Sequence, residues 1–328
     1  MAYNSIITRS NAEALIPEDV SREIIQALPT QSAFLRLATR MPDMTRKQLK
    51  IPVMTGNVEA AFVSGDTGLK QTSNMTWDDA YITAEELAVF VPIPEAVLDD
   101  ADYDIWGEVR PRIVEAFGKA IDAAAFFGTN KPTSWPAGLV PGAIAAGNTV
   151  ELSNPADLYG DINGVQGVVA KLEAQGLDAT SYVGALKLRA LLRSALDENK
   201  QPIFRTAYSN GAAGAPVYEL NGVAINFPNN GAWDDTAALL LAGDFRYARY
   251  AIRQDVTYKL ITEGIITNAS GEVVLNLPQQ DCVALRAVIR LGWALPKPVQ
   301  AIGGTSYYPF SVLTPEDTSE STSESTGN

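Results

Sequence analysis

The chain has 328 residues, 46% of them hydrophobic and 19% charged, which is ordinary for a folded protein of one elaborate or two modest domains. Its formal net charge of −13 argues against a dedicated nucleic-acid reader, because phosphate binding needs a basic surface, although such a protein could still enclose nucleic acid. The sequence contains no histidine and a single cysteine, Cys282, which excludes an internal disulfide, cysteine-based zinc sites and histidine-dependent triads. No apolar run approaches the ~18 residues of a membrane span, and residues 1–10 lack the profile of a secretory signal.

Residues 1–42 are predicted to contain an extended arm and two short helices. The arm consists of about a dozen polar residues that show no helix or strand pattern. The first helix is predicted to begin at Leu15-Ile16-Pro17, since proline suits a first helical turn, and to stop before Pro29. The second is predicted over 31–39, where Phe34 is one of its apolar residues.

Residues 43–94 contain two segments with alternating apolar side chains, 48–53 and 87–93, which predict strands. Both contain proline, which is typical of edge strands. About thirty residues separate them, and a structureless loop of that length is improbable in a compact domain. The alternative is a long two-stranded arm that reaches away from the body.

Such a hairpin is marginal by itself, so its apolar side chains need a surface on which to pack. Its large side chains are Phe62, Val63, Trp77 and Tyr81. Because a neighbouring subunit could supply that surface, these residues are predicted to be subunit contacts.

The segment 104–128 is predicted to be a long helix around which the rest of the chain is organised. Its apolar residues recur at the spacing of one helical face, and charged residues fall on the opposite face. Pro111 leaves two possibilities, since it either opens the regular helix or kinks one longer helix. Gly128 is expected to end the helix.

Beyond this helix, residues 131–153 are predicted to be loop because they are rich in proline, glycine and alanine. A hairpin is expected over 217–227, with Asn221-Gly222 at its turn. The remaining predictions are helices at 158–175 and 186–196, strands at 180–183 and 238–242, paired strands at 247–252 and 256–261, and a flexible loop at 210–216.

Residues 282–295 alternate apolar side chains with Arg286 and Arg290, which predicts a long strand. A helix is the competing interpretation, because alanine and arginine also favour helix. On a strand, the two arginines are expected to pair with carboxylates at the surface or at an interface. Residues 314–328 lack basic and aromatic side chains, which predicts a disordered acidic tail.

Signals for catalysis or metal binding are weak. Asp66-Thr67-Gly68 is the tripeptide of aspartic proteases, which place two such aspartates face to face, and a homodimer could supply the second. A plain turn at a hairpin tip is the favoured interpretation of this tripeptide. The acidic run at 100–104 lacks the later glycine and glutamate of a calcium loop, and carboxylates at the positive end of a helix explain it better. Neither a cofactor nor a metal is expected.

Several short sequences are informative through their order and spacing. They are Leu15-Ile16-Pro17, Val89-Phe90-Val91-Pro92-Ile93-Pro94-Glu95, Phe117-Gly118-Lys119-Ala120-Ile121-Asp122, Phe127-Gly128, Gly243-Asp244-Phe245, and Asp281-Cys282-Val283-Ala284-Leu285-Arg286 followed by Arg290 and 296–302. With these sequences, the chain resembles a tailed-bacteriophage major capsid protein of the Hong Kong 97-type fold, from about residue 15 to residue 310. The resemblance implies an α+β fold with an N-terminal arm, an extended β-hairpin called the E-loop, a peripheral (P) domain with a long spine helix, and an axial (A) domain.

The implied boundaries follow the chain: N-terminal arm 1–42, E-loop with its strand bases 43–94, P domain 95–157 with spine helix 104–128, A domain 158–277, P-domain return strand 278–313, acidic tail 314–328. In this family the E-loop lies over an adjacent subunit, and Lys70 near its tip joins the predicted contacts. Some relatives cross-link an E-loop lysine to an asparagine of a neighbour, but no matching asparagine can be placed here. Ile16, Phe34, Arg286 and Arg290 are the expected contacts of the N-terminal arm and the P domain.

The resemblance implies a non-enzymatic shell protein that forms the pentamers and hexamers of an icosahedral capsid. The capsid would enclose double-stranded DNA without sequence-specific binding, and would assemble in the host bacterial cytoplasm. Since Met1 lies too close to residue 15 for a cleaved scaffolding region, a separate scaffolding protein is expected, with a portal and a candidate cement protein as further partners. The rival interpretations are an encapsulin-like nanocompartment shell, an aspartic-type protease using Asp66, and a plain intracellular binding domain.

Overall fold

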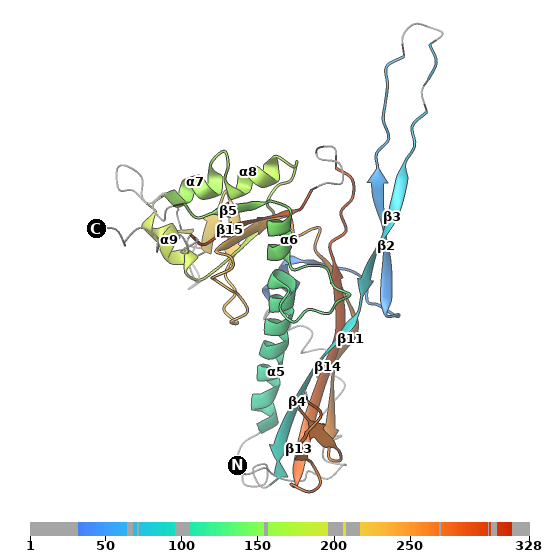
Figure 1. The fold of residues 1–328 in the computed structure, drawn as a ribbon, viewed down its shortest axis with the longest axis vertical. Coiled ribbons are helices and arrows are strands. Elements are labelled where there is room, and N and C mark those ends of the chain that lie inside the picture. Colours follow the sequence, from blue (N-terminus) through green and yellow to red (C-terminus); the bar gives the residue numbers. More distant parts are fainter. Residues whose placement is uncertain are drawn as a thin grey trace, which may run out of the picture.

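The computed structural model describes residues 32–63, 68–70, 72–95, 105–153, 157–195, 206–207, 217–268, 270–300, 302 and 307–316. They form two main sheets, a long helix along one of them, and a two-stranded ribbon that leaves the body (Figure 1). The predicted Leu15-Ile16-Pro17 helix, Asp66-Thr67, the 210–216 loop and the tail beyond 316 lie outside the described residues.

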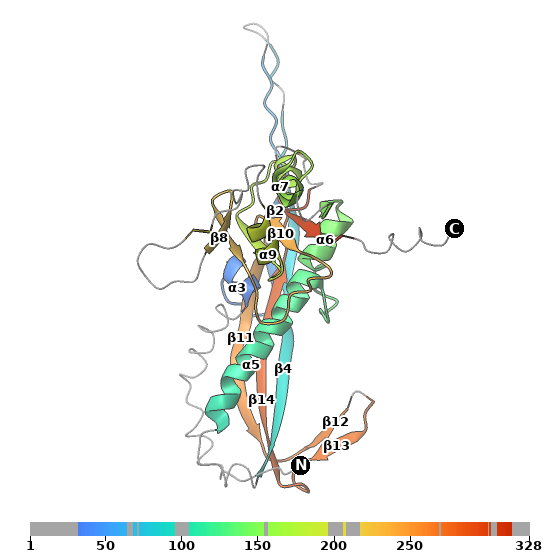
Figure 2. The ribbon, with the colours of Figure 1, turned by 90° about the vertical axis from the view of Figure 1, so that its left-hand side faces the viewer.

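The four-stranded sheet has the order β1-β11-β14-β4. Its strands are β1 (Thr39–Arg40), β11 (Arg249–Ile261), β14 (Cys282–Ala294) and β4 (Glu85–Pro94). Helix α5 (Ile105–Asp122) crosses one face of this sheet (Figure 2). Alternate residues of β14, such as Leu285 and Ile289, pack with Phe117 of the helix in one buried cluster, so the period-two pattern of the strand decides which face the helix covers.

Helix α5 runs through Pro111, which decides between the two possibilities in favour of one longer helix. It continues into a π-helical turn, η1 (Ala123–Phe127), and ends at Gly128 as predicted. Gly128 has φ 72°, a left-handed conformation that glycine adopts without the steric cost of a Cβ atom.

The seven-stranded sheet has the order β5-β15-β10-β6-β9-β8-β7. The hairpin of β8 and β9 turns at Asn221 and Gly222, both with positive φ, which confirms the predicted turn. The elements of this half are β5 (Thr149–Glu151), β6 (Ser181–Gly184), β7 (Thr206–Ala207), β8 (Val217–Leu220), β9 (Val223–Asn226), β10 (Leu240–Gly243), β15 (Phe310–Thr314), α6 (Leu139–Ala145), α7 (Leu158–Asn163), α8 (Val168–Glu173) and α9 (Leu188–Ser194).

Three local predictions are wrong. Residues 131–153 are not all loop, because α6 and β5 form there; Pro141 lies in the first turn of α6, where a missing N–H costs little. The single helix predicted over 158–175 is two helices, interrupted at residues 164–167. The paired strands predicted at 247–252 and 256–261 are one strand, β11, in which bulges between Ile252 and Thr257 take the place of a turn.

Sheet membership also crosses the predicted domain boundaries. Strand β11, predicted in the A domain, pairs with β14, whereas β5 and β15, predicted in the P domain, join the seven-stranded sheet. The chain therefore passes between the two sheets several times.

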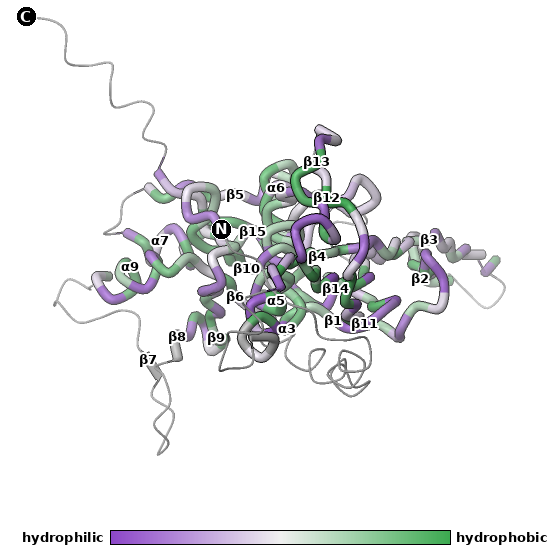
Figure 3. The backbone as a smooth tube through the Cα atoms, turned by 90° about the horizontal axis from the view of Figure 1, so that it is seen from below, coloured by the Kyte–Doolittle hydropathy of each residue, from purple (hydrophilic) through white to green (hydrophobic). Residues whose placement is uncertain are grey.

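The ribbon consists of β2 (Gln48–Gly56) and β3 (Thr76–Thr83), and extends to one side of the hydrophobic body (Figures 1 and 3). Its base is anchored, since Ile51, Val53 and Ile82 pack in a buried cluster with Ala251 and Ala294 of the four-stranded sheet. A smaller hairpin, β12 (Ile265–Thr267) and β13 (Val273–Asn276), projects from the opposite end of that sheet (Figure 2). The long arm predicted from the sequence is therefore present, with β3 rather than β4 as its second strand.

Candidate subunit-contact surfaces

The ribbon has one face that turns away from its own subunit. Trp77 and Tyr81 lie on the face opposite the buried Ile82, and their side chains are 65% and 52% exposed. Between them, Asp79 forms an ion pair with Lys50 of β2 at 2.5 Å. This face is therefore an aromatic surface with one neutralised charge pair.

The distal part of the ribbon is also exposed. Phe62 is 108% exposed, Leu69 92% and Val63 41%, and Lys70 lies on the surface as well. The backbone N–H of Glu59 donates to Ser73 Oγ at 2.7 Å and ties the two sides of the ribbon together. Large apolar side chains are therefore exposed close together along this part of the ribbon.

The second exposed face lies on the four-stranded sheet, opposite α5. We call it the basic face and define it by three rows of cross-strand neighbours, one residue each from β4, β14 and β11. The rows are Phe90–Arg286–Lys259, Ala88–Val288–Thr257 and Glu86–Arg290–Gln254.

The two predicted arginines differ in their partners. Arg290 donates through Nε and Nη2 to Glu86 at 2.8 and 2.6 Å, which confirms the expected pairing with a surface carboxylate. For Arg286, the described residues supply no ion pair, and its buried Nε has no hydrogen-bond acceptor among them. The expected pairing of Arg286 is therefore not found within the described subunit.

Phe34 does not lie on the surface. Its ring is fully buried, 5.3 Å from the Trp293 ring and 6.0 Å from the Phe126 ring, both in edge-to-face geometry. The helix that carries it, α3 (Ala33–Leu37), is shorter than predicted and is inserted into the core. The expectation that Phe34 contacts a neighbour is therefore wrong, and Ile16 lies outside the described residues.

Asp122, at the end of α5, is a buried carboxylate that the sequence did not single out. It accepts from Ser32 Oγ at 2.6 Å, from the backbone N–H groups of Ala33 and Phe34 at 3.0 Å each, and from Asn230 Nδ2 at 2.7 Å. Burial raises the pKa of this carboxyl group, and the hydrogen bonds oppose the rise. Its partners lie about ninety or more residues away along the chain, so no local pattern predicts the cluster.

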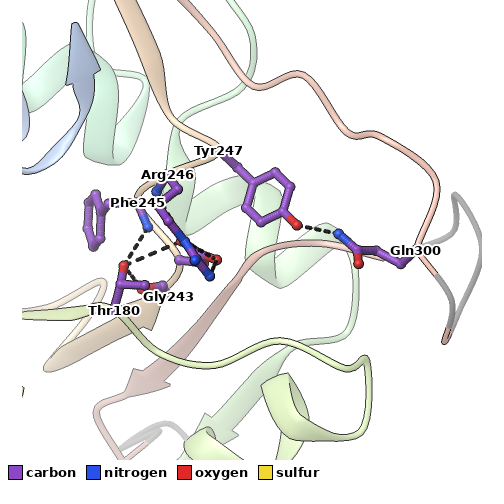
Figure 4. A network of polar contacts seen from close by, with 7 residues as sticks. Thr180, Gly243, Phe245, Arg246, Tyr247 and Gln300 are labelled. Atoms are coloured by element: carbon purple, nitrogen blue, oxygen red, sulfur yellow. Dashed lines mark hydrogen bonds and ion pairs between the residues drawn. The ribbon is translucent and has the colours of Figure 1, made fainter. Parts of the chain in front are cut away.

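The turn after β10 is fixed by a polar network (Figure 4). Arg246 donates to both carboxylate oxygens of the buried Asp244, at 2.9 and 2.6 Å. Thr180 Oγ1 accepts from the backbone N–H of Phe245, and Gln300 donates to the Tyr247 hydroxyl group. These contacts join the residue before β6, the turn after β10 and the segment after β14, so the Gly243-Asp244-Phe245 sequence has a structural role.

The described part of the chain contains no group of three or more carboxylate, cysteine or histidine side chains arranged to hold a metal ion. Asp66, the candidate protease residue, lies outside it. Among the helices described, none has the length and apolar character needed to cross a membrane.

Comparisons with known proteins agree on one family. The model of the Phage capsid family matches residues 12–302. The major capsid protein of Staphylococcus phage 80alpha is 24% identical over 294 residues, covering 88% of this chain and 84% of that protein. A solved chain of Microbacterium phage Oxtober96 is 36% identical with a TM-score of 0.74, covering 87% of this chain and 91% of that one. A solved chain of Mycobacterium phage Cain is 31% identical with a TM-score of 0.73, covering 96% and 100%. The chain belongs to the phage capsid family, and its role is that of a major capsid protein.

Proposed function

We propose that copies of this chain form the pentamers and hexamers of an icosahedral shell around the double-stranded DNA of a tailed bacteriophage. The exposed aromatic face of the ribbon carries this proposal. Trp77, Tyr81 and Phe62 have at least half of their surface open to solvent, on a structure too thin to cover them itself. The ribbon is then the E-loop, and it packs on a neighbouring subunit.

In this proposal α5 is the spine helix, the four-stranded sheet belongs to the P domain and the seven-stranded sheet to the A domain. Each subunit makes many weak contacts, which add up through multivalency in a closed shell. The net charge of −13 repels DNA, so the shell encloses its genome without gripping it, and an external motor packs it. The protein is not an enzyme, and a separate scaffolding protein, a portal and a cement protein are its partners in the host cytoplasm.

Electron microscopy of the full chain, expressed alone and with its neighbouring open reading frames, tests this proposal. We expect closed particles or capsomers, and fewer of them after Phe62→Ser combined with Trp77→Ser. A chain that stays monomeric under all these conditions would contradict the proposal. Protein cargo in place of nucleic acid inside the particles would favour the nanocompartment alternative.

A further inference from the structure

Helix α9 carries two arginines that have no carboxylate partner in the described part of the chain. Arg189 and Arg193 are four positions apart, so they lie on the same side of the helix. Neither forms an ion pair with a described residue, whereas the nearby Lys187 is paired with Asp235 at 2.7 Å. Like charges at this spacing destabilise a helix. The two arginines therefore carry unmatched positive charge on a chain whose formal net charge is −13.

Aromatic residues hold the two arginines in place. The guanidinium carbon of Arg189 lies 4.4 Å from the centre of the Phe227 ring and 5.5 Å from that of the Tyr218 ring. Arg193 Nη1 donates to the Tyr218 hydroxyl group at 3.0 Å. The buried Nε of Arg189 has no acceptor among the described residues. Glu219, the next residue of β8, is exposed on the opposite face of that strand. These contacts fix the side chains but bring no negative charge to them.

The acidic tail leaves the fold close to this helix. Two backbone hydrogen bonds of 2.8 Å connect the places where β15 ends and α9 begins: Leu239 N–H donates to Leu313 O, and Ala185 N–H donates to Leu239 O. Two strand spacings, about 10 Å, therefore separate the end of β15 from the residue after β6. At about 1.5 Å of rise per residue along α9, Arg193 is then within roughly 25 Å of the end of β15.

The tail has the length and the charge to reach the two arginines. Residues 317–328 follow the last described residue, Glu316, and span up to about 40 Å when extended. They include Asp317, Glu320 and Glu324 but no basic or aromatic residue. A carboxylate matches the fork of an arginine guanidinium, and the serine and threonine hydroxyl groups of the tail accept from further N–H groups. The match to the Phage capsid family ends at residue 302, so the family model does not describe this segment.

We propose that the acidic tail docks on Arg189 and Arg193 of its own subunit, and that its carboxylates form the ion pairs that the rest of the described subunit does not supply. The chain's own tail is the occupant because its tether keeps it at an effective concentration on the order of millimolar, which suffices for individually weak pairs. Since the tail has no large apolar side chain, the contact is ionic and salt releases it. The inference concerns a single subunit and goes beyond the proposed shell function.

Disulfide trapping in the full chain tests this docking. Ser321 lies among the tail carboxylates, and the exposed Ser194 directly follows Arg193. The Ser194→Cys/Ser321→Cys variant should form a disulfide within one chain when oxidised glutathione is added at low salt, because docking brings the two positions together. Proteolysis and mass spectrometry identify the linked peptides. The native Cys282 is buried and does not compete.

Ser153→Cys/Ser321→Cys is the matched control pair. Ser153 is exposed and follows Leu152, whose N–H donates to Thr314 O at 3.0 Å, so it lies nearer to the start of the tail than Ser194 does, but outside α9. A tail that moves freely favours the Ser153 pair. A docked tail favours the Ser194 pair, by about fivefold in initial rate at low salt if two exposed ion pairs form. This preference should disappear in about 1 M salt, where the Debye length is about 3 Å.

Charge variants separate the tail from other carboxylates. Replacing the tail carboxylates by amides leaves α9 intact and should abolish the preference for the Ser194 pair. This tail variant is Asp317→Asn/Glu320→Gln/Glu324→Gln. The matched variant Asp197→Asn/Glu198→Gln removes the two carboxylates that follow α9 most closely in the sequence, and should leave the preference unchanged.

Several results would overturn the inference. They are equal rates for the two cysteine pairs, a faster Ser153 pair, and a preference that survives the tail variant or high salt. A preference seen only in the Asp197→Asn/Glu198→Gln background would show that those carboxylates hold the arginines instead. Cross-linked dimers in place of the bond within one chain would assign the arginines to the tail of another copy. Particle formation is scored separately, so each of these results leaves the shell function standing.

Discussion

Phe34 and Phe62 are two phenylalanines whose substitution should separate folding from assembly. Phe34 is fully buried against Trp293 and Phe126, whereas Phe62 is 108% exposed at the distal part of the ribbon. Phe34→Ala removes a buried ring, two edge-to-face contacts and the packing of α3. It should lower the free energy of unfolding of the subunit by about 4 kcal/mol. Phe62→Ala should change the same quantity by less than about 0.5 kcal/mol, because no packing within the subunit is lost.

Chemical denaturation of unassembled subunits, followed by tryptophan fluorescence, measures both values. Particle yield of the same variants is then scored by electron microscopy. We expect Phe62→Ala to reduce the yield while the denaturation midpoint stays unchanged. If Phe34→Ala left the midpoint unchanged, or Phe62→Ala lowered it by as much, the assignment of one ring to the core and the other to an interface would be wrong.

Three further outcomes are expected within the subunit. The folded-state pKa of Asp122 lies above its ordinary 3.8, so its charged form costs stability at neutral pH. As the pH falls from that raised value towards 3.8, the wild type should become more stable to urea relative to the Asp122→Asn variant. A difference in urea midpoints between the two proteins that does not vary with pH would contradict this. Gly128→Ala should cost about 1 kcal/mol of unfolding free energy, as measured by thermal melting, since φ 72° is strained for alanine. Cys282 should react with a thiol reagent at the rate of unfolding, because its side chain is buried and burial raises its pKa; fast stoichiometric labelling of the folded chain would refute its burial.

The predictions that succeeded depended on local periodicity. The alternation over 87–93 and 282–295 identified β4 and β14, and the helical spacing over 104–128 identified α5 with η1. The arm itself was predicted from the length of the segment between two predicted strands, and the structure shows Trp77 and Tyr81 on the exposed face of the ribbon. The periodic signals of β4, β14 and α5 extend over many residues, so one proline such as Pro111 could not obscure them.

The predictions that failed needed contacts between distant parts of the chain. Whether 247–261 turns back or continues as β11 depends on its pairing with β14, about thirty residues later. Phe34 was expected to contact a neighbouring subunit, but its ring packs within the core against Trp293, which comes far later in the chain. Asp122 bonds to Ser32 and Asn230, which lie 90 and 108 positions away along the chain. Because neutral partners such as Asn230 carry no charge, the sequence shows no charge or hydropathy pattern that would pair them with Asp122.

The pairing of β4 has a consequence for the order of synthesis. In the described sheet, β4 forms its ladder with β14, and the Arg290–Glu86 pair spans 204 positions. A growing chain emerges from the ribosome in sequence. The backbone N–H and C=O groups of β4 therefore lack their β14 partners until some two hundred further residues have been translated. During this interval the proline-containing strand is a poor template for stray pairing, because Pro92 and Pro94 lack the N–H that a wrong partner would need. Replacing these prolines would therefore show its effect on nascent-chain aggregation before any effect on the finished particle.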